Sequence, residues 1–519
     1  MLTQLFRTKK LNDLLEEAEK PTHSLKKVLG ATDLVMLGIG AIIGAGIFAT
    51  VGTAAAGDAL RPGAGPSLIL SFGMTAIACG FAALCYAEFA TLVPISGSAY
   101  TYAYATLGEL VAWIIGWDLM IEYAIGNVAV SISWSGYFVE LLRGLGITLS
   151  PWSTIDFRSA HQGFDKAVAL MQSGTPFEQL DAGVTNAWLA VQNAPRLYDI
   201  PIIFNLPACA IVLALTVILV IGIKESSRFN GIMVGIKIIV LAFFIIVGSM
   251  YIKPENWSPF APNGFAGIKA GAAIVFFAYI GFDAVSTVAE ETRNPKRDLP
   301  IGIIGSLIIC TFIYMIVAAV FTGIIPYELL HSSLAHEKAE PLTMAMKYVK
   351  LDWVAGIVAF GSVVAHTAVL LVFQLGQPRI FFSMARDGLL PKTFARVHPR
   401  FKTPHVTTML TGLVVAIFSA FMNIDEMVDL TNIGTLFAFA LVCLGVIIMR
   451  VKEPDRQRAF KVPFSPWLPI LGIIACIFLM TGLPLVTWER FGIWLLLGAV
   501  VYFLYGMRKS VLHKKHSAQ

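Results

Sequence analysis

The stretch that decides the fold reads Gly38-Ile39-Gly40-Ala41-Ile42-Ile43-Gly44-Ala45-Gly46-Ile47-Phe48 and lies inside the first apolar segment of the chain. Four glycines fall within nine residues of it, although each glycine inside a helix costs roughly 1 kcal/mol relative to alanine. Close packing between membrane helices explains small residues on one helix face, but these four glycines are not confined to one face. We therefore expect the helix to unwind here.

Unwinding inside a membrane is tolerated only around a polar cavity, because lipid offers no partners to backbone N–H and C=O groups. The first half of the helix would end near Ile39 to Ile43 with free carbonyl groups. The second half would begin near Ala45 to Ile47 with free N–H groups and a partial positive charge. Carbonyl groups attract an ammonium and N–H groups attract a carboxylate. The pattern thus predicts a backbone site suited to an α-amino acid.

The composition excludes a soluble or disordered chain and leaves a polytopic membrane protein. Of the 519 residues, 57% are hydrophobic and 14% charged, whereas a soluble domain carries about 25% charge. Mean hydropathy is +0.74. All six cysteines lie in apolar runs, which favours packing residues over disulfides.

Twelve apolar runs are long enough to cross ~30 Å of hydrocarbon. They cover about 33–56, 66–92, 109–142, 200–222, 230–251, 268–290, 300–325, 351–383, 404–424, 427–449, 465–487 and 489–507. With both termini inside, the inside segments hold 25 Lys and Arg and the outside segments hold 10. The positive-inside rule therefore predicts cytoplasmic termini in the cell membrane.

A second interruption is expected five spans after the first. The sixth span contains Phe276-Phe277-Ala278-Tyr279-Ile280-Gly281-Phe282-Asp283, with Gly281 and Asp283 near its midpoint. Interruptions at matching places in two sets of five helices indicate an inverted repeat. The predicted fold class is an all-α membrane protein with twelve transmembrane helices, a 5+5 inverted repeat and discontinuous helices 1 and 6.

This organisation divides the chain into five parts. They are a cytoplasmic N-tail (1–30), a first repeat (31–251) with an outer loop at 143–199, a second repeat (268–449), helices 11 and 12 (465–507) and a cytoplasmic C-tail (508–519).

Five blocks of the chain resemble the amino acid–polyamine–organocation superfamily, in particular the bacterial twelve-helix form of its cationic amino acid transporter branch. The blocks are Gly38 to Phe48; Tyr86-Ala87-Glu88-Phe89 with Pro94 to Tyr100; Phe276 to Asp283; Glu290 to Pro295; and Gln377-Pro378-Arg379 with Met384 to Gly388. The resemblance implies the leucine-transporter-like fold, with substrate between helices 1, 3, 6 and 8.

The resemblance also implies site residues. Ile42, Ile43, Gly44, Ala45 and Gly46 would meet the main chain of the substrate. Carbonyl groups of Phe277, Ala278 and Ile280 would share its ammonium, and the Phe277 ring would act as an aromatic gate.

Three ionisable residues lie near the predicted midplane, where charge is costly and usually functional. Glu122 could contact a substrate side chain, or it could be a structural partner of a neighbouring helix, with Asp118 one turn below. Asp283 could cap the second half of helix 6, which we favour over substrate contact. His366 could face the substrate side chain, or it could be a hydrogen-bonded link between helices.

Lys237 lies about seven residues into helix 5, which is ~10 Å from its cytoplasmic start. It could snorkel to that surface. The resemblance implies instead that its ammonium replaces a sodium ion beside the carbonyl end of the first half of helix 1, and that its proton couples to transport.

The sequence predicts an amino acid permease, with proton symport favoured over amino acid exchange. An amino acid sensor or an intramembrane acyltransferase using His366 is a more distant alternative. No phosphate-binding loop, metal-ligand spacing or nucleophile elbow occurs, so we expect no enzyme activity, no cofactor, no metal and no nucleic acid. The expected partners are an amino acid, protons and the lipid bilayer. The sequence does not specify which amino acids are carried, the stoichiometry, the oligomeric state or a small membrane partner protein.

Overall fold

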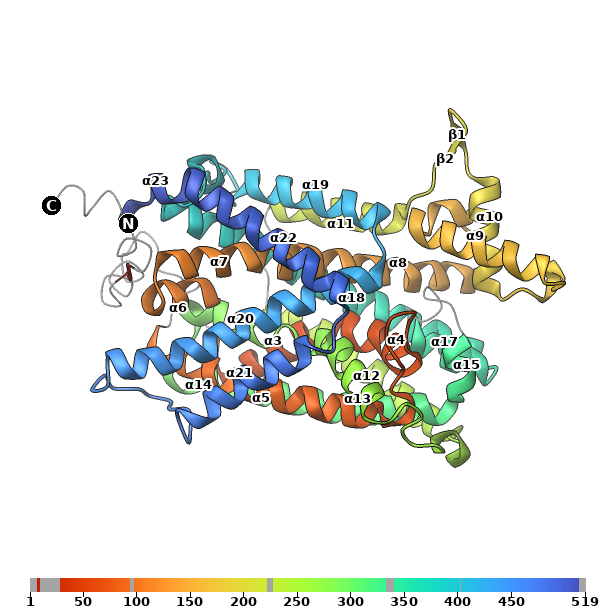
Figure 1. Ribbon diagram of the computed structural model, residues 1–519, viewed down its shortest axis with the longest axis horizontal. Helices are drawn as coiled ribbons and strands as arrows, with labels where there is room; N and C mark the ends of the chain where they lie inside the picture. The colour runs from red at the N-terminus through yellow and green to blue at the C-terminus, as the bar shows by residue number, and fades with distance from the viewer. Residues whose placement is uncertain are drawn as a thin grey trace.

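The computed structural model describes residues 7–9, 29–93, 98–221, 227–332, 340–401 and 403–512. The predictions for the rest of the N-tail and for residues 513–519 lie outside these residues. The fold is helical, and most of its long helices run along the longest axis of the molecule (Figure 1). Within these described residues, eight helical segments are long and apolar enough to cross a membrane, which confirms a polytopic membrane protein.

The first and sixth predicted spans are interrupted in the structure. The first consists of α3 (Ala31–Ile42), the π-helical η1 (Gly46–Thr50) and α4 (Val51–Ala56). The sixth consists of α13 (Gly264–Val275) and the 3-10 helices η7 (Phe276–Tyr279) and η8 (Asp283–Glu291).

The other predicted spans correspond to regular helices. The third is a continuous helix made of α7 (Glu109–Met120), the π-helical η3 (Ile121–Ile125) and α8 (Gly126–Gly144). The remaining ones are α5 (Leu68–Leu92), α11 (Leu206–Ile221), α12 (Ser227–Ser249), α14 (Pro295–Ile324), α18 (Asp352–Arg386), α19 (His405–Phe421), α20 (Ile424–Lys452), α21 (Trp467–Met480) and α22 (Leu485–Val501).

Two predicted boundaries are wrong. The eleventh span was expected to reach residue 487, but α21 ends at Met480 and α22 already begins at Leu485. The fourth span was expected to begin at residue 200, but α11 begins at Leu206. The preceding residues form a short antiparallel hairpin of β1 (Arg196–Leu197) and β2 (Ile200–Pro201). The apolar run continues through the hairpin, so hydropathy alone did not mark the start of the helix.

The predicted outer loop folds into a cap on one end of the bundle, which we call the outer end. The cap contains α9 (Phe157–Gln172), α10 (Ala182–Asn193) and the hairpin (Figure 1). Arg158 pairs with Glu426, and the side-chain amide of Asn423 donates to Ser159 Oγ at 2.8 Å. These contacts fix α9 to the start of α20.

Both ends of the described chain reach the opposite, inner end of the bundle (Figure 1). Lys9 pairs with Asp387 at 3.3 Å, and the backbone N–H of Val511 donates to the Asp387 carbonyl at 3.0 Å. The Ser510 hydroxyl donates to the buried carboxylate of Glu109. The two ends therefore meet on the same loop after α18. All six cysteines are free.

Candidate functional site

Helix 1 loses its regular hydrogen bonding at Ile43 and Gly44. Residue Ile43 has extended backbone angles (φ −74°, ψ 101°), and the π-helical η1 starts two residues after Gly44. The last carbonyl groups of α3 and the first N–H groups of the second half therefore lack partners within the helix. The interruption falls inside the glycine-rich stretch, where the sequence predicted it.

Helix 6 is interrupted by one extended residue and one glycine. Ile280 is extended (φ −61°, ψ 133°), and Gly281 has φ +121°, which side-chain-bearing residues rarely adopt. The backbone N–H of Gly281 donates to Asp283 Oδ1 at 3.2 Å. Asp283 thus binds the backbone at the break, before the start of η8, and its role as a cap of the second half stays a prediction.

The two interruptions touch each other backbone to backbone. A Cβ atom added to Gly46 would lie 2.1 Å from the Ala278 Cα atom. A Cβ atom added to Gly281 would lie 2.8 Å from the carbonyl carbon and oxygen of Ala41. Because backbone atoms cannot move aside as a flexible side chain can, glycine is required at both positions.

The carbonyl groups at the end of α3 are bound by two side chains from other helices. Lys237 is 0% exposed, and its Nζ donates to the carbonyl oxygens of Gly40 at 2.6 Å and Ile43 at 2.9 Å. The Tyr314 hydroxyl of α14 donates to the Ile42 carbonyl at 2.9 Å. Each carbonyl oxygen keeps a second lone pair for a further donor. Lys237 does not snorkel to the surface.

His366, in α18 (the eighth predicted span), links that helix to α8 of the third span and also contacts helix 1. Its Nδ1 lies 2.6 Å from the Ser362 carbonyl oxygen, so Nδ1 carries a proton, and its Nε2 lies 2.8 Å from Ser133 Oγ. The imidazole packs against the rings of Phe48 and Tyr137 at centroid distances of 5.8 and 5.5 Å. These contacts fit the interhelical link, and they also place His366 on the second half of helix 1.

The helix that carries His366, α18, also packs against the interruption of helix 1. Val369, one turn beyond His366, would be 2.4 Å from a Cβ atom added to Gly44. Three residues that the sequence predicted for the site therefore lie close to the same interruption: Gly44, Lys237 and His366.

Glu122 and Asp283 form a buried carboxyl pair. Glu122 lies in the π-helical η3, and its carboxyl group is an electrostatic neighbour of that of Asp283. One oxygen of each carboxyl group finds no donor within the described part of the chain. A proton shared between the two groups would supply the missing donor. Other buried polar atoms in the described part of the chain also have no hydrogen-bond partner. They include both carboxyl oxygens of Asp118 and both side-chain polar atoms of Asn127 and Gln377.

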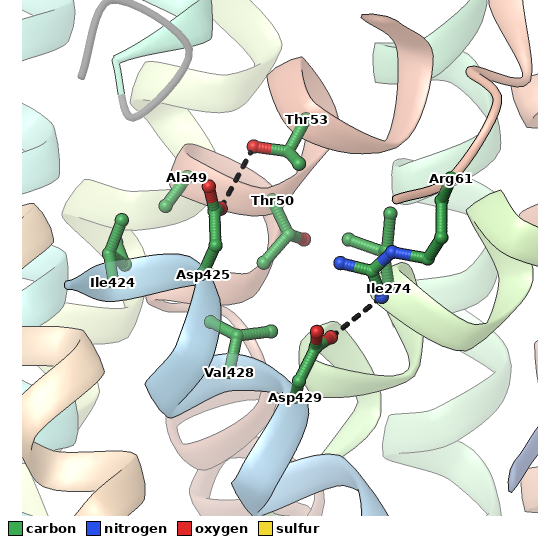
Figure 2. A pocket seen from close by; sticks show the side chains of 9 residues that line it. All are labelled: Ala49, Thr50, Thr53, Arg61, Ile274, Ile424, Asp425, Val428 and Asp429. Atoms are coloured by element: carbon green, nitrogen blue, oxygen red, sulfur yellow. Dashed lines mark hydrogen bonds and ion pairs between the residues drawn. The ribbon is translucent and has the colours of Figure 1, made fainter. Parts of the chain in front are cut away.

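A narrow crevice, partly open to solvent and with room for about one water molecule, lies on the outer side of the interruptions. Figure 2 shows it between helix 1, Ile274 of α13 and the start of α20. Two polar bridges border it: Arg61 Nη1 donates to Asp429 Oδ1 at 2.7 Å, and Thr53 donates to Asp425 at 3.2 Å (Figure 2). Its residues Ala49 and Thr50 lie three and four residues after Gly46, the last predicted site residue of helix 1.

Sequence reasoning missed several of these partners. Tyr314, Ser133 and Val369 lie in apolar runs without any local signal, and only the packing of the helices places them at the site. The π-helical segment around Glu122 also had no predicted counterpart. Segments of this kind occur often at functional sites.

Comparisons with known proteins show which family the chain resembles. The sequence matches the amino acid permease family over residues 29–503. It is 47% identical over 514 residues to the branched-chain amino acid permease BcaP of Bacillus subtilis (strain 168), covering 99% of this chain and 100% of that protein. It is 44% identical to the methylthioribose transporter of the same organism, covering 99% and 100%. It is 35% identical to the vacuolar cationic amino acid transporter 4 of Arabidopsis thaliana, covering 88% and 68%.

Proposed function

Because the chain belongs to the amino acid permease family, we propose that it is a secondary active transporter that carries L-amino acids across the cell membrane by alternating access. The observation that carries this proposal is the pair of touching interruptions in helices 1 and 6. The N–H groups that begin the second half of helix 1, and the free lone pairs of the carbonyl oxygens at the interruptions, suit the carboxylate and ammonium of a zwitterion.

The proposed substrate contacts follow the backbone. The N–H groups that open the second half of helix 1, at Gly44, Ala45 and Gly46, would receive the substrate carboxylate. The carbonyl groups of Ile42 and Ile43, with those of Phe277, Ala278 and Ile280, would share its ammonium. Glu122 and His366 would face the side chain.

We propose twelve crossings in a 5+5 inverted repeat followed by two helices, with both termini in the cytoplasm. The eight long apolar helices, the shorter apolar α11, α19 and α21, and the continuous third helix support this count. The meeting of Lys9 and Val511 at Asp387 supports an even number of crossings.

Proton coupling is proposed to run through Lys237. In its protonated form the ammonium makes charge-assisted hydrogen bonds to the Gly40 and Ile43 carbonyl groups, which are about twice as strong as neutral ones. Loss of the proton weakens its hold on the end of α3. The proton would thus bias the position of the first half of helix 1, and the Glu122–Asp283 pair is a second place where a proton can be held.

Access from outside is proposed to require opening of the bridge between Arg61 and Asp429. This bridge joins the segment after α4 to α20 across the outer crevice (Figure 2). Burial disfavours the charged guanidinium and lowers the pKa of Arg61, but the carboxylates of Asp429 and Asp58 outweigh burial and raise the pKa above its ordinary value. The guanidinium therefore stays charged.

The test is uptake of radiolabelled leucine, alanine and lysine by the purified protein in proteoliposomes, with and without an inward proton gradient. We expect saturable uptake of at least one amino acid and acceleration by the gradient. Strict dependence on amino acid inside the vesicle, with no effect of the gradient, would replace symport by exchange. Competition by methylthioribose without competition by any amino acid would overturn the substrate class, a result that the 44% identity to the methylthioribose transporter makes worth testing.

A further inference from the structure

The hairpin before α11 exposes large apolar side chains at the outer end of the bundle. Leu197, Tyr198 and Ile200 are 60%, 92% and 64% exposed. Ile202, which follows directly, is also exposed. Single exposed hydrophobic residues are common, but a continuous exposed group of this size marks an interaction surface.

The hairpin has a fixed position on the molecule. Leu197 pairs with Ile200, and the turn residues Tyr198 and Asp199 have φ of 48° and 66°. At its base, the Ile202 N–H donates to the Pro195 carbonyl at 2.8 Å. Ile203 is buried in a cluster with α9 and α10, so the hairpin is tied to the cap.

The exposed group is continuous with the lipid-facing surface of the bundle. The first residue of α11, Leu206, is itself 49% exposed and lies only four residues after Ile202. Exposed apolar residues continue along α11 and the adjacent α19: Leu213, Val217, Ile218, Ile221, Met409, Leu413, Ile417 and Phe421. Figure 1 shows the hairpin projecting sideways at the outer end of α11 and α19, away from the bundle.

We propose that the hairpin, residues 196–202, inserts its apolar tip into the interfacial region of the outer lipid leaflet. Tyrosine and branched apolar side chains favour that region, where Tyr198 keeps its hydroxyl in contact with headgroups. The unpaired backbone groups at the edges of the hairpin exclude deeper insertion into hydrocarbon, since water or phosphate must reach them. The charged side chains of Arg196 and Asp199 also exclude deeper insertion into hydrocarbon. The inserted tip holds the cap of α9 and α10 at a fixed height above the membrane.

The experiment places a nitroxide spin label at Tyr198→Cys in a Cys209→Ala background, because Cys209 is the one cysteine of the six that is not fully buried. The full-length protein is reconstituted in phosphatidylcholine vesicles with phosphatidylglycerol. Collision rates with oxygen, which partitions into lipid, and with a water-soluble nickel chelate are then measured. Matched controls carry the label at the lipid-facing Val217 and at Asp165, an exposed position on α9.

We expect the ratio of oxygen to nickel accessibility at position 198 to be several-fold higher than at 165 and to approach that at 217. In a Leu197→Ser, Ile200→Ser background, the ratio at 198 should fall toward that at 165. A ratio at 198 equal to that at 165 in the otherwise unchanged chain would overturn the proposal. Dipolar coupling between labels on two copies, at high dilution in lipid, would also overturn it and assign the hairpin to a contact between copies.

Discussion

The interruptions in helices 1 and 6 are satisfied in different ways. At helix 6 the turn between the two halves is bound locally, because Gly281 supplies the unusual φ and Asp283, two residues later, binds the backbone. The side-chain amide of Asn432, from α20, donates to the last carbonyl groups of α13, at Ala273 and Ile274. At helix 1 the partners come from distant parts of the chain: Lys237 and Tyr314 bind the carbonyl groups of α3. The turn of helix 6 is therefore built into its own sequence, although the end of its first half also relies on α20. The helix 1 interruption depends on other helices, and one of its partners can gain or lose a proton.

The largest effect is expected from Gly281→Val. The substitution combines a backbone angle that valine rarely adopts with contact against the Ala41 backbone, and together these cost at least ~3 kcal/mol. We expect no measurable uptake and poor recovery of folded protein in detergent. Gly73→Val is the matched control, since nothing lies within 4 Å of its added Cβ atom. Normal uptake by Gly281→Val would mean that helix 6 needs no local interruption.

Gly46→Ala tests whether the two interruptions must touch. Gly46 lacks the positive φ of Gly281, so the only penalty is the clash with the Ala278 Cα atom. We expect folded protein with substrate binding weakened at least ~100-fold, measured by scintillation proximity with labelled substrate. Gly80→Ala, which meets no neighbour within 4 Å, should bind like the parent.

Lys237→Met tests whether the proton on Lys237 is needed to couple transport to a pH gradient. The variant retains the length and apolar stem of lysine but removes the donor to Gly40 and Ile43. We expect uptake driven by a pH gradient to fall ~10- to 100-fold, while exchange between equal substrate pools on both sides continues. Lys253→Met, in the outer loop after α12, should leave both rates unchanged. Gradient-driven uptake that persists in Lys237→Met would reject the coupling role.

Asp283→Asn and Asp283→Ala together test the local character of the helix 6 interruption. Asparagine retains an oxygen that can accept from the Gly281 N–H, whereas alanine does not. We therefore expect the alanine variant to be less stable than the asparagine variant by about 1–2 kcal/mol, measured by thermal unfolding. Equal stability of the two would show that Asp283 acts through its charge on Glu122 rather than as a cap.

The smallest effect is expected on the melting temperature, and it comes from a residue outside both interruptions. Burial, and then the neighbouring Glu140, raise the pKa of Glu340 to about 8. Because the pKa is raised above the unfolded value of about 4.3, the stabilising contribution is present below pH 4 and is lost as pH rises toward 8. We expect the melting temperature to fall by a few degrees between pH 5 and pH 8, and Glu340→Gln to flatten this slope. Glu178→Gln, at an exposed position of the cap, should retain it.

Much of this fold could be predicted from the sequence, because lipid imposes simple rules. Apolar length located the spans, and the glycines at 38 to 46 located the first interruption, since few sequences of that kind can remain helical. Lys237 was placed correctly beside α3 through the family resemblance. The first positions depend on local composition, and the position of Lys237 depends on what the family resemblance implies.

The remaining features depend on which helices meet. The contact of Gly46 with Ala278, the hydroxyl of Tyr314 on Ile42 and the pairing of Glu122 with Asp283 join residues far apart in the chain. Hydropathy carries no information on such pairs. It also failed at the hairpin, where Ile200 and Ile202 extend the apolar run of the fourth span although the backbone there is not helical.

A cation that is covalently part of the protein cannot be diluted. On the proposed mechanism, the ammonium of Lys237 fills the place of a coupling metal ion beside α3. Its local concentration is the same in fresh water and in brine. Amino acid uptake by the cell would then be insensitive to the external salt concentration and would respond only to the external pH.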